Sequence, residues 1–418
     1  MRFSRLGERL TGHSGTLQLM EDLGAAMATD EPLIMLGGGN PARIDAMSEV
    51  FAKRMAQMAA DSATFERVMG VYDGQCGDPE FLSSVARLLN REFDWPVTEK
   101  NIAVTNGSQN AFFYLFNLFA GTGVTGEMQR VFLPLAPEYI GYGDQALEPG
   151  MFISRKPRIE MLDNREFKYR LDPVEAVPVN SAAICVSRPT NPTGNVLTQD
   201  ELAQLRALAD GNDIPLIIDN AYGTPFPDII FRDANPVYDE RTVVCLSLSK
   251  LGLPGVRTGI VVANEEIIRA LGALNAVFAL ASSSFGPALV RPLFDNGEIV
   301  RLSREVIKPY YHGAAQRALA WLDESLGDSP ARIHSPEGAF FMWLWCPDLP
   351  ITSAELYRRL RKRNVLVVPG QYFFPGLQDE WRHTDECIRI NYSQEPNMVK
   401  EGLAIIGEEV RRAYACQE

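Results

Sequence analysis

Four short apolar segments between residues 182 and 264 decide the fold: AAICVSR (182–188), PLIIDN (215–220), VVCLSLS (243–249) and GIVVAN (259–264). TQDELAQLRALADG (198–211) lies between the first two, and its Thr198 and Glu201 have the spacing of a helix capping box. Short continuous apolar strands that alternate with helices are typical of a mainly parallel sheet covered on both faces. The sequence therefore predicts an α/β fold with its ligand site at the carboxyl ends of the strands.

The chain on either side of this region predicts a second, smaller unit. Downstream, a long helix over about 299–321 precedes strand-like and helical stretches that alternate: AFFMWLWC (339–346), TSAELYRRLRKR (352–363), VLVVPG (365–370) and CIRINYS (387–393). This order favours an α+β domain. We expect an N-terminal arm and part of the small domain in residues 1–48, a large domain in residues 49–300 and a small C-terminal domain in residues 301–418.

Composition excludes several classes of protein. The 418 residues include 40 Lys or Arg and 53 Asp or Glu, a net charge of −13, whereas a sequence-independent nucleic-acid binder needs surplus cations. The six cysteines form no CxxC motif and there are four histidines, so we expect no metal site. The most apolar stretch, 111–121, is too short to span a bilayer, and the first ten residues lack the apolar core of a signal peptide. We expect a cytoplasmic protein that binds neither nucleic acid nor membrane.

Polar residues follow each strand of the predicted parallel sheet. Asn191 lies in the Pro-containing turn after the first segment, and Asp219 ends the second, with Tyr222 close behind. Lys250 follows the third segment, and Arg257 lies 257 − 250 = 7 positions later. Taken singly, each is more often a turn, cap or solvated residue than a functional one. Together, at one edge of a sheet, they specify a ligand.

The chemistry of that ligand follows from the residue types. Lys250 suits an aldehyde, with which it forms a Schiff base, and Asp219 suits a ring nitrogen that stays protonated. Asn191 and Tyr222 suit a phenolate oxygen, and Arg257 suits a phosphate. Aldehyde, pyridinium, phenolate and phosphate are the groups of pyridoxal 5′-phosphate (PLP). The same anion would be bound by free amides where NIAVTN (101–106) runs into a helix that begins with Gly107, Ser108 and Gln109.

Nine motifs together resemble the class I and II aminotransferases of PLP fold type I. They occur in the order of that family, from about residue 35 to 395: GGGNP (37–41), YDGQCG (72–77), TNGSQ (105–109), APEYIGY (136–142), SRPTNPTGN (187–195), IDNAYG (218–223), SLSKLGLPGVRTG (247–259), PEGAFFMWL (336–344) and IRINYS (388–393). The resemblance implies a large domain with a mainly parallel mixed sheet between helices and a smaller α+β domain. The loop from Lys250 to Arg257 is one residue shorter than in many relatives.

The resemblance also implies the role of each site residue. Lys250, Asp219 and Tyr222 would be catalytic, with PLP held on Lys250 as a Schiff base. The cofactor site would consist of Gly107, Ser108, Gln109, Tyr139, Asn191, Asp219, Tyr222, Ser247, Lys250 and Arg257. Tyr139 would stack on the ring, and Arg389 would grip the substrate α-carboxylate with help from Gly39 and Asn191. Tyr72 would reach the phosphate of a neighbouring subunit, which implies a homodimer with a shared active site.

The implied reaction is ping-pong transamination between amino acids and 2-oxo acids. Longer stretches resemble one branch of this family more closely, among them HSGTLQLMEDL (13–23), MLGGGNPA (35–42) and TNGSQNAFFYLFNLFAG (105–121). This closer resemblance implies L-valine and pyruvate as the pair, giving 3-methyl-2-oxobutanoate and L-alanine. The residues alone leave other aliphatic or aromatic amino acids open, because they support an apolar substrate side chain only weakly. A PLP-dependent C–S lyase would keep the same residues, so it also stays open. A DNA-binding regulator with a similar domain is disfavoured by the net charge, and an inactive binding protein by the complete set around Lys250.

Overall fold

The computed structural model describes residues 2–12, 14–27, 33–173 and 176–415; His13 and Cys416 lie outside them. Thirteen α-helices occur in this part of the chain: α1 (Arg5–Leu10), α2 (Gly15–Met27), α3 (Asp45–Ala60), α4 (Ser62–Gly70), α5 (Pro79–Phe93), α6 (Ser108–Phe119), α7 (Gln199–Gly211), α8 (Glu265–Ala279), α9 (Phe285–Asp295), α10 (Glu298–Leu302), α11 (Lys308–Leu326), α12 (Ser353–Arg361) and α13 (Pro396–Ala415). None of the described helices is long and apolar enough to cross a membrane.

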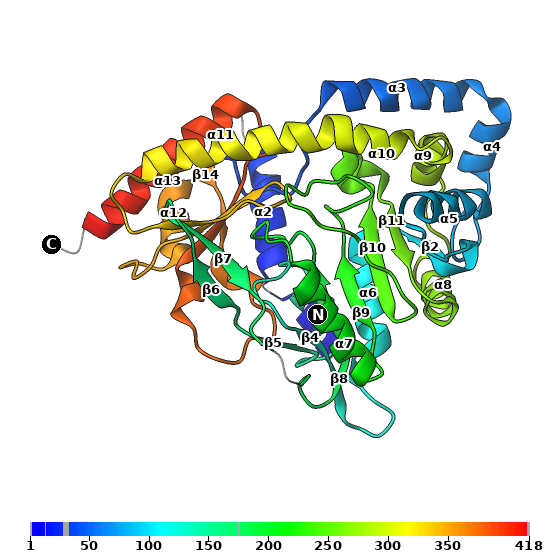
Figure 1. Cartoon of the computed structure of the whole chain (residues 1–418), viewed down its shortest axis with the longest axis horizontal. Coiled ribbons are helices and arrows are strands. Elements are labelled where there is room, and N and C mark those ends of the chain that lie inside the picture. The colour runs from blue at the N-terminus through cyan, green and yellow to red at the C-terminus, as the bar shows by residue number, and fades with distance from the viewer. Residues whose placement is uncertain (1, 13, 28–32, 174–175, 416–418) are drawn as a thin grey trace.

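An eight-stranded sheet forms the centre of the molecule (Figure 1). Its strand order is β2 (Ile102–Thr105), β11 (Gly259–Val262), β10 (Thr242–Ser247), β9 (Leu216–Asp219), β8 (Ser181–Ser187), β4 (Met128–Leu133) and β3 (Gly121–Thr122), with β5 (Phe152–Ser154) paired to β4. The strands β5, β4, β8, β9 and β10 are parallel, whereas β11 is antiparallel to both of its neighbours. The predicted mainly parallel sheet is therefore confirmed, with GIVVAN as the strand that reverses direction.

Helices cover both faces of this sheet, because alternate side chains of each buried strand point to opposite sides. Ile217 of β9 packs in the apolar cluster that contains Phe112 and Phe116 of α6. Its neighbour Ile218 packs in the cluster that contains Leu202 of α7 on the other face. The capping box predicted for α7 is confirmed: Thr198 Oγ1 accepts from Glu201 N (3.2 Å), and Glu201 Oε2 accepts from Thr198 N (2.8 Å).

A six-stranded sheet lies beside the first (Figure 1). Its order is β15 (Val368–Pro369), β16 (Cys387–Asn391), β13 (Phe341–Trp345), β12 (Arg332–His334), β7 (Glu166–Arg170) and β6 (Arg158–Met161). The hairpin β6–β7 comes from the middle of the chain and joins through parallel pairing of β7 with β12. A separate two-stranded sheet joins distant parts of the chain: β1 (Ile34–Met35) pairs in parallel with β14 (Val365–Leu366). The domain limits at residues 48 and 300 stay a prediction.

The C-terminal helices pack against each other beside this second sheet (Figure 1). The helical region expected over 299–321 is observed as α10, a π-helical segment (Ser303–Ile307) and α11.

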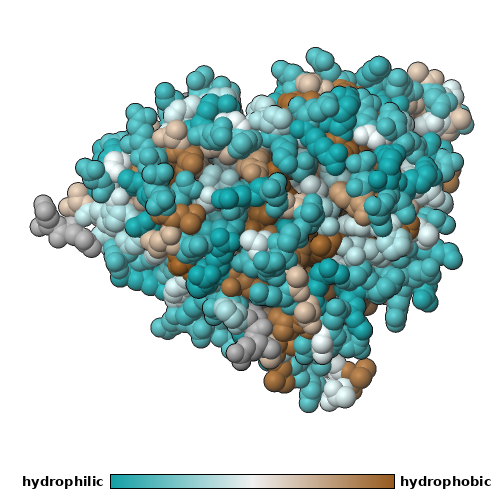
Figure 2. Space-filling model, in the orientation of Figure 1, coloured by the Kyte–Doolittle hydropathy of each residue, from teal (hydrophilic) through white to brown (hydrophobic). Residues whose placement is uncertain are grey.

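The face of the molecule shown in Figure 2 is mostly hydrophilic, with apolar residues in small groups between polar ones. This surface agrees with the charged composition.

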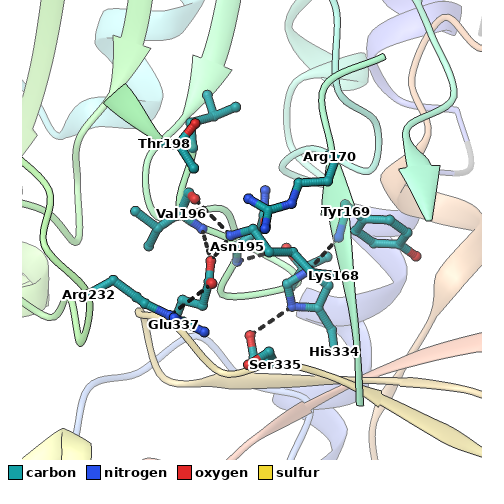
Figure 3. Close-up of polar contacts among 12 residues, drawn as sticks. Lys168, Tyr169, Arg170, Asn195, Val196, Thr198, Arg232, His334, Ser335 and Glu337 are labelled. Carbon is teal, nitrogen blue, oxygen red and sulfur yellow. Dashed lines mark hydrogen bonds and ion pairs between the residues drawn. The ribbon is translucent and has the colours of Figure 1, made fainter. Parts of the chain in front are cut away.

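A buried ion pair joins the two sheets (Figure 3). Lys168 of β7 and Glu337, in the loop between β12 and β13, are each 3% exposed and bonded to each other. Both also bind the backbone of Val196, which follows β8: Lys168 Nζ donates to its carbonyl oxygen, and Glu337 Oε2 accepts from its N–H (both 3.0 Å). Arg232 adds a second ion pair to Glu337 at 3.1 Å. The turn that carries Asn191 is thus fixed to the second sheet.

Lys168→Met should destabilise the protein by up to about 3 kcal/mol, because the buried Glu337 would keep only the largely exposed Arg232 as its counter-ion. The free energy of unfolding from denaturant titration measures this loss. Lys168→Met combined with Glu337→Gln should recover at least half of it, since the neutral amide can still accept from Val196. Equal stability of the single and double variants would show that the charge of Glu337 does not depend on Lys168.

Candidate active site

A cavity of about 510 Å³ opens at the carboxyl ends of β8, β9 and β10, where the sequence predicts the ligand site. Eleven of the predicted site residues line it: Gly39, Ser108, Gln109, Tyr139, Asn191, Asp219, Tyr222, Ser247, Lys250, Arg257 and Arg389. They come from segments spread over 350 positions, since 389 − 39 = 350, and the fold brings them into one space. Gly107 lies against Arg257 at the edge of this group.

Lys250 lies in a 3₁₀ turn (Ser249–Leu251) that directly follows β10. Its Nζ donates to the carbonyl oxygen of Gly39 at 2.9 Å and lies 5.2 Å from the centroid of the Tyr222 ring. Burial lowers the pKa of Lys250 to about 8, and the positive charge of Arg389 acts in the same direction. The amine therefore loses its proton more readily than an ordinary lysine and becomes a nucleophile near neutral pH.

Asp219 is the last residue of β9, and both of its carboxylate oxygens accept hydrogen bonds. Oδ1 accepts from Ala221 N at 3.1 Å, and Oδ2 accepts from the Tyr142 hydroxyl at 2.8 Å. Burial raises the pKa of Asp219, while the bond from Tyr142 acts in the opposite direction by stabilising the anion. The bond from Tyr142 was not expected from the sequence.

An anion cradle lies where α6 begins. Gly107, with φ of 90°, precedes the first residue of the helix, whose free N–H groups and dipole favour negative charge. A Cβ on Gly107 would lie 2.1 Å from Nη2 of Arg257, so only glycine lets the guanidinium approach the helix start this closely. Ser108, Gln109 and Ser247 supply polar side chains beside it. This combination of charge and geometry fits a phosphate group.

Arg389 of β16 lines the same cavity as Lys250 and is 1% exposed. Nη1 donates to Asn191 Oδ1 at 2.8 Å, and Nη2 donates to the carbonyl oxygen of Gly37 at 2.7 Å. Its Nε is buried and has no hydrogen-bond partner among the described residues. Burial lowers the pKa of Arg389 to about 10, so a ligand carboxylate here would stabilise its positive charge.

The remaining wall of the cavity is largely apolar. Thr16, Leu19 and Met20 of α2 line it, together with Ile140. The sequence alone could not show whether the segment TLQLMEDL reaches the site. In the structure, Thr16 and the residues three and four positions after it share one face of the helix, and that face lines the cavity. The helix is held there by the Tyr372 hydroxyl, which donates to Gln18 Oε1 at 2.5 Å.

Other predicted residues lie elsewhere. Tyr72 is 78% exposed and does not line the cavity of its own chain. Phe340 and Phe341 of PEGAFFMWL lie behind the site: the Phe340 ring centroid is 5.3 Å from Lys250 Nζ, and that of Phe341 is 4.4 Å from Arg389 Cζ.

Three buried residues behind Asp219 were missed by the sequence analysis. Tyr142 bonds Asp219, Ser187 lies within 3.2 Å of the Tyr142 hydroxyl, and Glu138 bonds Ser187. One signal was available in APEYIGY (136–142): an acidic residue between proline and tyrosine in an otherwise apolar and aromatic segment. The contact with Ser187 spans 187 − 138 = 49 positions, which local spacing does not reveal.

Comparison with known proteins gives consistent matches over the whole chain. The family model of aminotransferase class I and II matches residues 32–406. The valine–pyruvate aminotransferase of Escherichia coli (strain K12) is 48% identical over 417 residues, which cover 99% of each chain.

Solved structures agree with these matches. The crystal structure of valine–pyruvate aminotransferase from Salmonella typhimurium LT2 superposes with a TM-score of 0.88 at 46% identity, covering 96% of this chain and 99% of that one. The structure of a candidate amino-acid aminotransferase from Psychrobacter arcticum 273-4 reaches a TM-score of 0.96 at 46% identity over 99% of each chain.

The lowered pKa of Lys250 predicts how its reactivity depends on pH. In cofactor-free protein, labelling of Lys250 by an amine-directed reagent should rise about tenfold per pH unit up to pH 8 and then level off, because only the neutral amine reacts. Mass spectrometry of the labelled peptide measures this rate, with exposed Lys53 as the internal reference and Lys250→Arg as the blank. Labelling of Lys250 that keeps rising to pH 10 would contradict the lowered pKa.

Proposed function

Because the chain belongs to the class I and II aminotransferases, we propose that it transfers the amino group of L-valine to pyruvate, giving 3-methyl-2-oxobutanoate and L-alanine. The observation that carries this proposal is the 48% identity, over 99% of both chains, to a protein named valine–pyruvate aminotransferase. Family membership confirms the predicted fold type I and PLP as the cofactor. The two substrates would use one cavity in turn, as in a ping-pong reaction.

The cavity supports a definite placement of the cofactor. Bound PLP supplies an electron-withdrawing ring that stabilises negative charge on the substrate carbon. Arg257 and the start of α6 would bind its phosphate, and Asp219 would hold the proton of its ring nitrogen. Tyr222 and Asn191 would bond its phenolic oxygen, while Tyr139 would stack on the ring. These assignments are proposals supported by the shared cavity lining.

Lys250 would hold the cofactor and then move a proton. Once an amino acid displaces its Nζ, the free amine would take the proton from the substrate Cα and pass it to C4′, the carbon of the cofactor's aldehyde group. A pKa of about 8 suits this exchange, because acid–base groups work best near the operating pH. Contact with Gly39 at 2.9 Å supports a defined starting position for the amine.

Arg389 would bind the α-carboxylate that all the proposed substrates share. Its fork of N–H donors matches the geometry of a carboxylate, and its hydrogen bond to Asn191 fixes its orientation. Gly39 lies beside it in the same cavity and would assist.

The wall of the cavity supports an apolar monocarboxylic substrate. Lys250, Arg257 and Arg389 are the cations among the described residues that line it, and each has a proposed partner. A second substrate carboxylate would find no further cation there, and burial of an unpaired charge is costly. Leu19, Met20 and Ile140 offer apolar contacts to an isopropyl group instead.

We also propose a homodimer, to which Tyr72 contributes. Phe65, Met69, Val71 and Tyr72 are between 49% and 78% exposed. Val277, Phe278 and Leu280, at the end of α8, are between 56% and 80% exposed. The two groups belong to neighbouring segments, because Asn275 Nδ2 donates to the carbonyl oxygen of Gln75 at 2.9 Å. Exposed apolar groups of this kind favour burial against a second copy.

A cytoplasmic location stays a prediction.

Purified protein loaded with PLP should form L-alanine from L-valine and pyruvate. With aspartate or glutamate as donor, kcat/KM should be lower by at least about tenfold, because the extra carboxylate is unpaired. Lys250→Ala should lose both the absorbance band of the bound cofactor and turnover. Release of pyruvate and ammonia from cystathionine, without alanine formation from valine, would instead identify a C–S lyase.

Tyr72→Phe should leave the dimer intact in analytical ultracentrifugation but weaken PLP binding by about tenfold, because one hydrogen bond to a charged phosphate is lost. Titration of cofactor-free protein measures the dissociation constant. Tyr238→Phe, which alters a tyrosine stacked on Trp95, is the matched control. A monomeric wild-type protein with unchanged affinity in Tyr72→Phe would refute the shared site.

A further inference from the structure

A buried carboxyl group that the proposed mechanism does not use lies behind the cavity. Glu138 follows β4 and is 1% exposed. Its Oε1 accepts from Ser187 N at 3.0 Å, and its Oε2 lies 2.5 Å from Ser187 Oγ in a second hydrogen bond. Within the described chain, no lysine or arginine forms an ion pair with it.

This carboxyl group connects to Asp219 through two hydroxyl groups. Ser187 Oγ lies 3.2 Å from the Tyr142 hydroxyl, and either oxygen can be the donor. The Tyr142 hydroxyl lies 2.8 Å from Asp219 Oδ2, to which it donates. Three oxygen–oxygen contacts thus run in a row from Glu138 to Asp219.

The number of protons decides how this row is bonded. If Glu138 is ionised, the two hydroxyl groups supply two protons for three contacts. Tyr142 then donates to Asp219, Ser187 donates to Glu138, and the contact between Ser187 and Tyr142 contains no proton. If Glu138 is protonated, three protons fill three contacts, and every bond donates toward Asp219.

The electrostatics of the surroundings favour the protonated form. Burial raises the pKa of Glu138, and the charge of Asp219 acts in the same direction, while two hydrogen bonds from Ser187 and one from the backbone N–H of Tyr139 act against them; the resulting pKa is about 8. The other titratable side chains that interact with it are Tyr142 and Cys185, and burial raises the pKa of both as well. Around Glu138, Asp219 is therefore the group suited to carry negative charge.

We propose that Glu138 is a positioning residue that stays protonated and, through Ser187 and Tyr142, directs a hydroxyl proton at Asp219 Oδ2. Tyr142 donates to Asp219 in either protonation state of Glu138. A neutral Glu138 also lets Ser187 donate to Tyr142 and places no second negative charge near Asp219, so Asp219 stays ionised where burial alone would favour its neutral form. The negative charge then lies beside the ring nitrogen of PLP and not on Glu138. This inference rests on the proposed role of Asp219 and is independent of the substrate pair.

Infrared spectroscopy tests the protonation of Glu138 without any activity measurement. The wild-type protein should show the C=O stretch of a protonated carboxyl group at pH 6–7, and Glu138→Gln should remove it. Glu337→Gln is the matched control: this buried carboxylate is paired with Lys168 and Arg232, so the variant should keep the band. Absence of any band difference between wild type and Glu138→Gln would overturn the proposal.

Cofactor affinity and absorbance test the role of the row. Glu138→Gln should keep the PLP dissociation constant within about twofold of wild type, because its amide can donate to Ser187 Oγ and accept from Ser187 N. Glu138→Leu and Ser187→Ala should each weaken binding by about tenfold and shift the absorbance band of the bound cofactor. Ser187→Ala keeps the test decisive if Glu138→Leu does not fold.

Equal losses in Glu138→Gln and Glu138→Leu would show that an ionised carboxylate is required and would overturn the proposal. Unchanged affinity and spectrum in both Ser187→Ala and Glu138→Leu would show that the row is only structural. Failure of valine and pyruvate as substrates would leave all of these readouts intact, so the two proposals fail separately.

Discussion

The parallel register of β8, β9 and β10 is the constraint on which the site depends. It pairs Ser187 with Asp219, and Asp219 with Cys245, so these strands end at the same edge of the sheet. Because side chains alternate along a strand, a slip of one residue in β9 would turn Asp219 to the opposite face. The apolar clusters on both faces oppose such a slip, since it would expose Ile217 and Ile218 to the wrong neighbours.

Removal of water is what gives the groups at this edge their chemical character. Burial lowers the pKa of Lys250 and of Arg389, and it raises the pKa of Asp219. In each case burial favours the neutral form of the side chain, so each group is suited to a ligand that restores or complements its charge. Phosphate, pyridinium and α-carboxylate are such ligands. The fold thus prepares a polarised cavity before any reactant enters it.

Much of this could be predicted from the sequence, and the rest could not, for physical reasons. The strands around Lys250 and Asp219 are short apolar runs with polar ends. The parallel sheet, and a ligand site at the carboxyl ends of its strands, could therefore be predicted. The α7 cap was readable because its two partners are three positions apart. The hairpin β6–β7 was missed because its pairing with β12 is a long-range contact with no local signature. Tyr142 and Glu138 were missed because their role depends on burial and on contacts with residues distant in sequence, neither of which local spacing reveals.

The position of α2 separates the parts of the chain that carry chemistry from the part that faces the substrate side chain. Lys250, Asp219 and Arg389 lie on or beside strands of the sheets, whereas Thr16, Leu19 and Met20 lie on a helix near the N-terminus. The Tyr372 hydroxyl donates to Gln18 of that helix. Related enzymes could therefore diverge in selectivity by altering one peripheral helix, while the strand ends that hold the cofactor stay constant.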